Sequence, residues 1–113
     1  MPQYMLMFVG TDEDWGSRSK EERTQAYAAI GTWWEQLSKQ GVIKSGEELQ
    51  PRRTATTVKR VNGQMKVFDG PFIESKEHVG GYALIQAADL DEALRVAKSW
   101  PGGDVEVRPI VER

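Results

Sequence analysis

The sequence contains no cysteine and a single histidine among its 113 residues. Without cysteine the chain cannot form a disulfide, a thiolate metal site or a cysteine nucleophile. One histidine also excludes a site in which two or three histidines of the same chain bind one metal ion. The glycine-rich patterns that bind nucleotide phosphates are absent as well. We therefore expect neither a bound metal nor another cofactor.

The chain also lacks the features by which proteins reach membranes or nucleic acids. No apolar run approaches the ~20 residues that cross a bilayer, and the first residues lack the basic start and long apolar stretch of a signal peptide. The 15 basic and 17 acidic residues give a net charge of −2, so no overall positive field favours nucleic acid. We expect a cytoplasmic protein whose partners include neither a membrane nor a nucleic acid.

What the sequence does contain is enough residues for one folded domain. A chain of 113 residues buries about two-thirds of its unfolded surface. We therefore expect residues 1–113 to form a single domain around one core. Four tryptophans are many for this length, and each of them needs a place in the core or against a partner.

Two segments carry the signals of helices. In the first, Ser19 and Glu22 have the spacing of a capping box, and Gly41 stands where a C-terminal cap belongs. In the second, Asp89 and Glu92 repeat the N-terminal cap. An apolar stripe at helical spacing follows each cap. The stripes comprise Ala26, Ile30, Trp33 and Leu37 in the first helix and Leu90, Ala93, Leu94 and Ala97 in the second.

Short apolar runs and apolar–polar alternation predict four strands. The first of them is apolar at every position, which favours a strand that is buried on both faces. The polar stretch 11–18 predicts a loop, and its acidic cluster at 12–14 either belongs to that loop or binds a cation. The strands are expected at residues 4–9, 42–46, 81–87 and 105–109.

A β-hairpin is expected between the second and third of these strands. Residues 54–61 and 64–68 are rich in β-forming side chains, and the Asn62-Gly63 pair between them favours a type I′ turn. Without this inserted hairpin the order is β-α-β-β-α-β, which is the ferredoxin-like arrangement of the α+β class.

Such a sheet has both helices on one face and leaves the other face bare. Apolar side chains from the first and third of the four strands, such as Met5, Met7 or Leu84, would lie on that bare face, depending on the register. An open apolar face of this size usually has a partner. A second copy of the same chain is the simplest one, so we expect a homodimer.

The segment 69–81 is the part of the chain that folding explains least. Long irregular connections in small domains are more often functional than shorter ones. Asp69 is either a general base, a ligand-binding residue, or part of a simple turn at Asp69-Gly70-Pro71. His78 is a weaker catalytic candidate because no second histidine assists it, and the alternative is an exposed or capping residue.

At this segment the sequence resembles the YCII-related proteins. Residues 67–77 with Gly80-Gly81-Tyr82 are similar to the signature of the branch that is named after its Asp-Gly-Pro-Phe tetrapeptide, here residues 69–72. The similarity covers nearly the whole chain. It continues through residues 4–7, 46–49, 55–58, 89–93 and 105–110.

The resemblance implies a ferredoxin-like fold that assembles as a dimeric α+β barrel. The wider group is suspected of enzymatic activity because of a His/Asp pair in a cleft. This chain departs from that pattern, since it has no histidine in its first strand–helix region and its single histidine is His78. Some members are encoded near extracytoplasmic-function sigma factors, which implies a regulatory or stress context.

Two functions remain open. The first is a homodimeric small-molecule-binding or enzyme-like domain, whose pocket lies between sheet and helices and is closed by residues 69–81. The second is a non-catalytic regulatory module that binds another protein through a further apolar patch. In the first, Asp69 is the acid–base candidate. The expected polar contacts are Glu74, Lys76 and Arg108, and the expected walls are Phe72, Tyr82 and Trp34.

Overall fold

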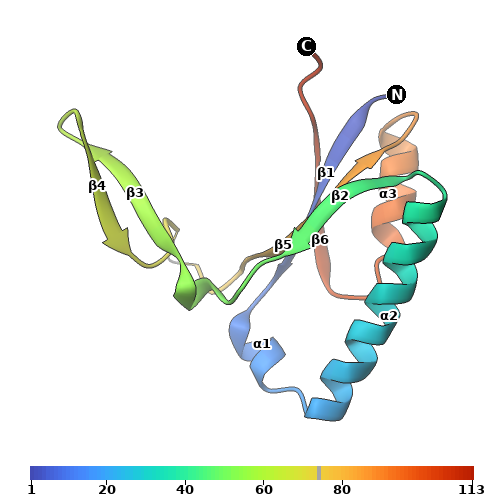
Figure 1. Cartoon of the computed structure of the whole chain (residues 1–113), viewed down its shortest axis with the longest axis horizontal. Coiled ribbons are helices and arrows are strands. Elements are labelled where there is room, and N and C mark those ends of the chain that lie inside the picture. Colours follow the sequence, from blue (N-terminus) through green and yellow to red (C-terminus); the bar gives the residue numbers. More distant parts are fainter. Residues whose placement is uncertain (74) are drawn as a thin grey trace.

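A computed structural model describes residues 1–73 and 75–113 of the chain. Four strands form an antiparallel sheet in the order β2-β5-β1-β6, and β3 and β4 form a separate two-stranded sheet (Figure 1). The elements in chain order are β1 (Gln3–Gly10), α1 (Asp12–Gly16), α2 (Lys20–Lys39), β2 (Ile43–Glu48), the 3-10 turn η1 (Arg52–Thr54), β3 (Thr56–Val61), β4 (Gln64–Asp69), β5 (His78–Gln86), α3 (Leu90–Lys98) and β6 (Asp104–Pro109).

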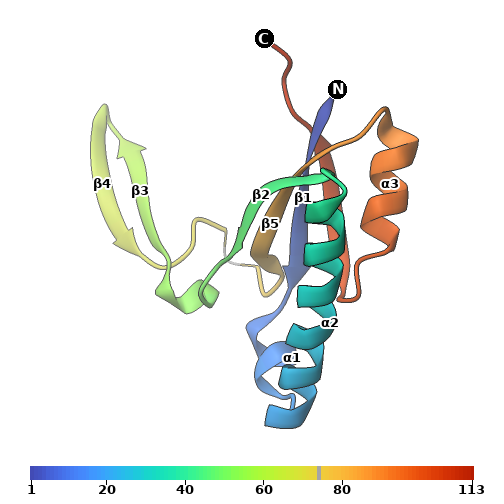
Figure 2. The same cartoon turned by 45° about the vertical axis from the view of Figure 1, so that its right-hand side comes forward.

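The four-stranded sheet and the two long helices are consistent with the ferredoxin-like arrangement expected from the sequence. Neighbouring strands of this sheet are antiparallel throughout. Both α2 and α3 lie on the same side of it (Figures 1 and 2). The predicted α+β class is therefore confirmed. Among the described residues, none of the helices has the length and apolar character to cross a bilayer.

The predicted starts of both long helices are confirmed. At α2, the hydroxyl of Ser19 accepts the backbone N–H of Glu22 at 3.0 Å, and the Glu22 carboxylate accepts the N–H of Ser19 at 3.1 Å. These hydrogen bonds hold the pKa of Glu22 below its ordinary value of 4.5, because the ionised carboxylate is the better acceptor. At α3, Oδ1 of Asp89 accepts the N–H of Glu92 at 2.9 Å.

The loop predicted at 11–18 is wrong, because Asp12–Gly16 form the short helix α1. Thr11 caps this helix with its hydroxyl, which accepts the N–H of Asp14 at 3.0 Å. Acidic residues occupy the first turn, where the helix dipole favours them. The acidic cluster is therefore part of a capped helix.

Tyr27 of α2 connects α1 and the end of β2. Its ring meets Trp15 of α1 edge-on, with 5.2 Å between ring centroids. Its hydroxyl donates to the Glu48 carboxylate at 2.8 Å. Burial raises the pKa of Tyr27 above its ordinary 10.0, and the hydrogen bond to Glu48 adds to this effect.

An aromatic cluster joins the sheet to α2 and to the end of α3. Phe8 of β1 stacks on Trp100 with 3.9 Å between ring centroids, and Trp33 of α2 meets both rings edge-on. The indole N–H of the buried Trp33 donates to the Ser99 hydroxyl at 2.8 Å, so its polar atom is satisfied. The rest of the core comprises Tyr4, Leu6, Ile43, Ala83, Ile85, Ala87 and Ala93.

The apolar stripe predicted for α3 is wrong at two positions. Leu90 and Leu94 are exposed. Val96 packs against the core together with Ala93 and Ala97 instead. The inward side of this short helix is set by these small side chains, which let it lie close to the sheet.

Side chains alternate along β1 and β5, so the sheet has one covered and one open face. Tyr4 and Leu6 are buried beneath the helices. Met5 and Met7 therefore lie on the opposite face, where they stand across from Leu84 and Tyr82 of β5. The prediction that β1 is buried on both faces is wrong within a single chain. The expected apolar character of the open face is confirmed.

Strands β3 and β4 form an arm, residues 56–69, that stands apart from the four-stranded sheet on the side away from α2 and α3 (Figures 1 and 2). Asn62 and Gly63 join the strands with φ angles of 51° and 81°, as a type I′ turn requires. The radius of gyration is 16.1 Å, compared with about 13 Å for a compact domain of about 100 residues. The arm therefore extends the molecule well beyond a compact shape.

Close packing at Gly46 of β2 leaves no room for a side chain. A Cβ atom there would collide with the carbonyl oxygen of Tyr82 and would lie 2.5 Å from the ring of Trp34. In contrast, Gly31 in α2 has open space around it. These two glycines offer a matched pair of substitutions.

We expect Gly46→Ala to lower the free energy of unfolding by about 2 kcal/mol, because the added methyl forces β2 away from β5 and Trp34. Gly31→Ala should raise it by about 1 kcal/mol, since alanine is the better helix former. Urea unfolding followed by circular dichroism measures both. A Gly46→Ala protein as stable as the parent would contradict this packing.

The capping box makes the free energy of unfolding depend on pH. The folded-state pKa of Glu22 lies below 4.5, so this carboxyl stabilises the fold above its ordinary pKa and the effect is lost as the pH falls through the folded-state value. Ser19→Ala removes the hydroxyl partner of Glu22. We expect the variant to be less stable than the parent near neutral pH and the difference to shrink on acidification. Thermal unfolding over a pH series tests this, and a constant difference would refute it.

Candidate functional site

The pairing of β1 with β5 brings the single histidine beside α1. His78, at the start of β5, lies opposite Gly10 at the end of β1. Asp12 begins α1 two residues later. Nε2 of His78 lies 3.0 Å from Oδ1 of Asp12, and the two side chains are 18% and 33% exposed. A partly buried histidine–aspartate pair therefore stands at this end of the sheet.

A β-bulge separates His78 from the regular part of β5. Phe8 lies opposite Gly81 and Val9 lies opposite Val79, so Gly80 has no residue across from it in β1. An extra residue of this kind shifts the alternation of side chains by one position. Val79 is accordingly exposed, whereas His78 is partly buried and meets Asp12.

Both ring nitrogens of His78 face acceptor oxygens. Nδ1 lies 3.2 Å from the backbone carbonyl oxygen of Lys76, and Nε2 faces the Asp12 carboxylate. A neutral imidazole has one N–H and donates to one of them, whereas the imidazolium donates to both. The ring is thus oriented from two sides.

A cavity of about 90 Å³ lies beside this pair. A water molecule takes ~30 Å³ in the liquid, so the cavity has room for a few waters or for a group the size of a carboxylate. Asp12 belongs both to the cavity wall and to the histidine pair. The lining residues are Thr11, Asp12, Glu13, Arg52 and Lys76.

Arg52, a half-buried side chain with one buried guanidinium nitrogen, belongs to the wall of this cavity. It begins η1, the turn that leads from β2 into the arm. Its Nη1 atom is buried and has no hydrogen-bond partner among the described residues. An unpaired buried guanidinium N–H is unfavourable, and a carboxylate or phosphate oxygen satisfies it well. Nη1 of Arg52 therefore favours an acceptor oxygen at this point of a wall that also contains Asp12, Glu13 and Lys76.

Of the predicted site residues, Lys76 lines this cavity, and His78 contacts Asp12 of the cavity wall. Asp69 ends β4 and lies opposite Thr56 in the arm. Phe72 is exposed, and the Lys59 ammonium lies 5.7 Å from the centroid of its ring.

The other predicted site residues lie elsewhere. Tyr82 and Arg108 stand across from Met7 and Met5 on the open face of the sheet. Trp34 packs in the helix layer against Trp33, with 6.2 Å between ring centroids. Glu74 lies outside the described residues. The predicted set as a whole does not converge on one point within a single chain.

The segment 69–71 has the geometry of the simple turn weighed from the sequence. Gly70 has a φ of 101°, which glycine adopts readily. Its N–H donates to the carbonyl of Ala55 at 2.9 Å, and its carbonyl accepts the hydroxyl of Thr57 at 2.7 Å. These bonds close the base of the arm.

Sequence reasoning missed Asp12 and Arg52 as members of the site. Residues 12, 52 and 78 share no local spacing, and they meet only through the strand register and the turn η1. The one local signal was the Thr11 cap, which fixes Asp12 in the first turn of a helix.

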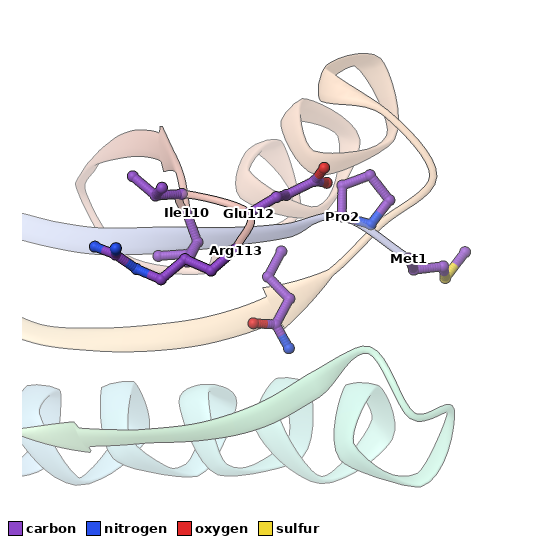
Figure 3. A pocket seen from close by; sticks show the side chains of 7 residues that line it. Met1, Pro2, Ile110, Glu112 and Arg113 are labelled. Carbon is purple, nitrogen blue, oxygen red and sulfur yellow. The ribbon is translucent and has the colours of Figure 1, made fainter.

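A larger concavity of about 450 Å³ lies at the opposite end of β1 (Figure 3). Its walls are the first three and last four residues of the chain. The side chains of Glu112 and Arg113 extend in different directions, so the charged groups do not converge (Figure 3). Ligand sites combine a cavity with converging polar groups, so the cavity beside His78 is the better candidate.

Within residues 1–73 and 75–113, no three histidine or acidic side chains gather in a way that could hold a metal ion. The Asp12–His78 pair therefore lacks a third protein ligand among these residues. The ionisable groups of the site are the imidazole of His78, the carboxylates of Asp12 and Glu13, and the cationic side chains of Arg52 and Lys76.

Comparison with known proteins gives two matches. The YCII-related domain, as a sequence family, matches residues 3–112 of the chain. A protein of Rhizobium meliloti (strain 1021), described as uncharacterised, is 33% identical over 112 residues. That alignment covers 95% of this chain and 90% of the relative, so the similarity extends over almost all of both proteins.

Proposed function

The chain belongs to the family of YCII-related domains, and on this basis we propose that it is a homodimeric, enzyme-like domain that binds a small molecule bearing an acidic group. The contact between His78 and Asp12, beside a cavity lined by Arg52 and Lys76, supports this most directly. A positioned imidazole next to an anion-binding wall is an arrangement that moves protons on a bound acid.

The acidic group of the ligand binds between Arg52 and Lys76. Arginine pairs with carboxylates and phosphates through two N–H groups at once, and Nη1 of Arg52 is buried and unpaired among the described residues. The cavity of about 90 Å³ is smaller than a typical pocket for a whole ligand. It therefore accepts the acidic group, while the rest of the ligand extends beyond it.

His78 serves as the acid–base group in this proposal. Asp12 orients the ring through Nε2, and the Lys76 carbonyl fixes the other nitrogen. In this proposal a proton passes between a bound acid and the imidazole by way of the Asp12 carboxylate, which lines the cavity and contacts His78.

The assembly that we propose is a dimeric α+β barrel in which the arm is an insertion. The apolar open face, with Met5, Met7 and Leu84, supports it because such a face is unfavourable in water. The tetrapeptide at residues 69–72 supports membership of the Asp-Gly-Pro-Phe branch.

The remaining predicted site residues fit this assembly in two groups. Asp69 and Phe72 are carried at the base of the arm, and Tyr82 and Arg108 lie on the open face. We propose that these four contribute to ligand binding only in the dimer. Trp34 remains part of the core in this proposal.

A second candidate function is a non-catalytic regulatory module that binds another protein. The exposed pair Leu90 and Leu94, one turn apart on α3, favours it because such a pair forms an apolar patch outside the open face of the sheet. A partner protein would cover this patch without needing the cavity beside His78.

We expect acetate to bind at the cavity and to shift the amide NMR signals of residues 11–13 and 76–78. Arg52→Gln should weaken this binding about tenfold or more, because a charge-assisted hydrogen bond is lost. The matched control is Arg53→Gln, which changes the exposed neighbour in the same turn and should leave the affinity within about twofold. Equal acetate binding by the parent and Arg52→Gln would refute the site.

We expect the parent protein to be a dimer at micromolar concentration and Leu84→Glu to be mainly monomeric. A carboxylate buried without a partner in the interface costs several kcal/mol. Leu94→Glu on the outer side of α3 is the control and should remain a dimer. Light scattering after size-exclusion chromatography measures the mass, and a monomeric parent would contradict the assembly.

A further inference from the structure

One face of the arm carries three exposed apolar side chains that no described residue covers. Val58 stands across from Val67, and Met65 lies on the same side two cross-strand pairs further along, across from Arg60. These three side chains are 55%, 67% and 55% exposed, respectively. A two-stranded hairpin by itself is marginally stable in water, so this face needs a surface to pack on.

The arm is held at its base, where residues 70–72 contact its second face. Thr57 donates its hydroxyl to the Gly70 carbonyl at 2.7 Å, and the Lys59 ammonium lies 5.7 Å from the Phe72 ring centroid. The Gly70 N–H bonds back to Ala55. The 70–72 segment thus braces one face of the arm and leaves the Val58–Met65–Val67 face free.

The charges of the arm complement those of the open sheet face. The arm, residues 56–69, contains three basic side chains and one acidic side chain, which is Asp69 at its base. On the open face, Glu47, Asp104 and Glu106 stand across from Tyr82, Val9 and Met7, respectively. Arg108 is the one base among them and is paired with Glu106 at 3.0 Å. A basic arm and an acidic rim of the same chain attract each other.

The arm does not meet the rim of its own sheet. Both views show the arm standing off from β1, β2, β5 and β6 (Figures 1 and 2). The rim that it can cover is therefore the rim of another copy. Such an exchange is reciprocal in a two-fold dimer, because each arm then reaches the partner in the same way.

The open face by itself is smaller than the area that a stable dimer interface buries, and the arm adds to it. Four strands at ~4.8 Å spacing and six residues at ~3.3 Å each give a footprint of roughly 400 Å². A stable interface buries about 800 Å² on each partner. The two strands of the arm add roughly 200 Å² of footprint by the same spacing.

We propose that each arm packs, through Val58, Met65 and Val67, on the second subunit of the dimer, beside the acidic rim of its open sheet face. This presupposes the dimer of the proposed function and adds to it an arm that clasps the partner. Arg60, which lies on the same face of the arm as these three side chains, is then placed near the acidic rim of the other subunit.

The test is the dimer dissociation constant, measured by sedimentation velocity for Val67→Asp and for Val111→Asp. Val111 is 71% exposed, similar to Val67, but lies outside the arm. We expect Val67→Asp to weaken the dimer about tenfold or more, because a carboxylate then faces an apolar contact and an acidic rim. Val111→Asp should change the constant less than about twofold. Circular dichroism confirms that each variant is folded.

A second measurement identifies what the arm touches. The chain has no cysteine, so Val67→Cys carries one photo-crosslinker in a mixture of ¹⁵N-labelled and unlabelled chains. Mixed-isotope cross-links from the arm to residues 43–48 or 104–109 support the clasp. Cross-links confined to one chain mean that the arm folds onto its own sheet, and cross-links between chains that avoid these strands mean that the arm packs elsewhere. Either result overturns the proposal.

The outcomes separate this inference from the proposed assembly. A dimer that Leu84→Glu dissociates and Val67→Asp leaves intact overturns the arm contact and leaves the barrel standing. A dimer that Val67→Asp weakens and Leu84→Glu leaves intact supports the arm contact and overturns the barrel. A monomeric parent overturns both.

Discussion

The antiparallel pairing of β1 with β5 determines most of the arrangement of this molecule. Because side chains alternate along both strands, the register puts Tyr4 and Leu6 under the helices and sends Met5 and Met7 to the open face. The same register ends with His78 opposite Gly10, just before the helix that begins at Asp12. The core, the exposed apolar face and the histidine–aspartate pair are therefore three results of one strand alignment.

The aromatic residues secure that alignment from the helix side. Phe8, Trp33 and Trp100 come from β1, α2 and the residues after α3, and their rings contact one another. Burying such rings contributes several kcal/mol, and the Trp33 N–H avoids a penalty by donating to Ser99. The cluster thus holds both helices on one face of the sheet, and the opposite face is left for other contacts.

Local features of this chain could be predicted from its sequence, and distant contacts could not. The caps at Ser19 and Asp89 involve residues three apart, so the spacing alone identifies them. The same cap at Thr11 went unrecognised because the helix that it starts has a single turn and no apolar stripe. The contact of His78 with Asp12 depends on strand register, which one sequence does not state. Leu90 and Leu94 show that an apolar residue at helical spacing can still lie outside the packed side.

Gly80, the extra residue of the bulge, places His78 on the face of the sheet where it meets Asp12. Removing one codon between Gly81 and His78 would restore strict alternation and carry the imidazole to the other face of the sheet, away from Asp12. Every chemical group would survive such a deletion, yet the pair would be lost. The His78–Asp12 contact therefore depends on the length of this stretch of β5 as well as on its composition.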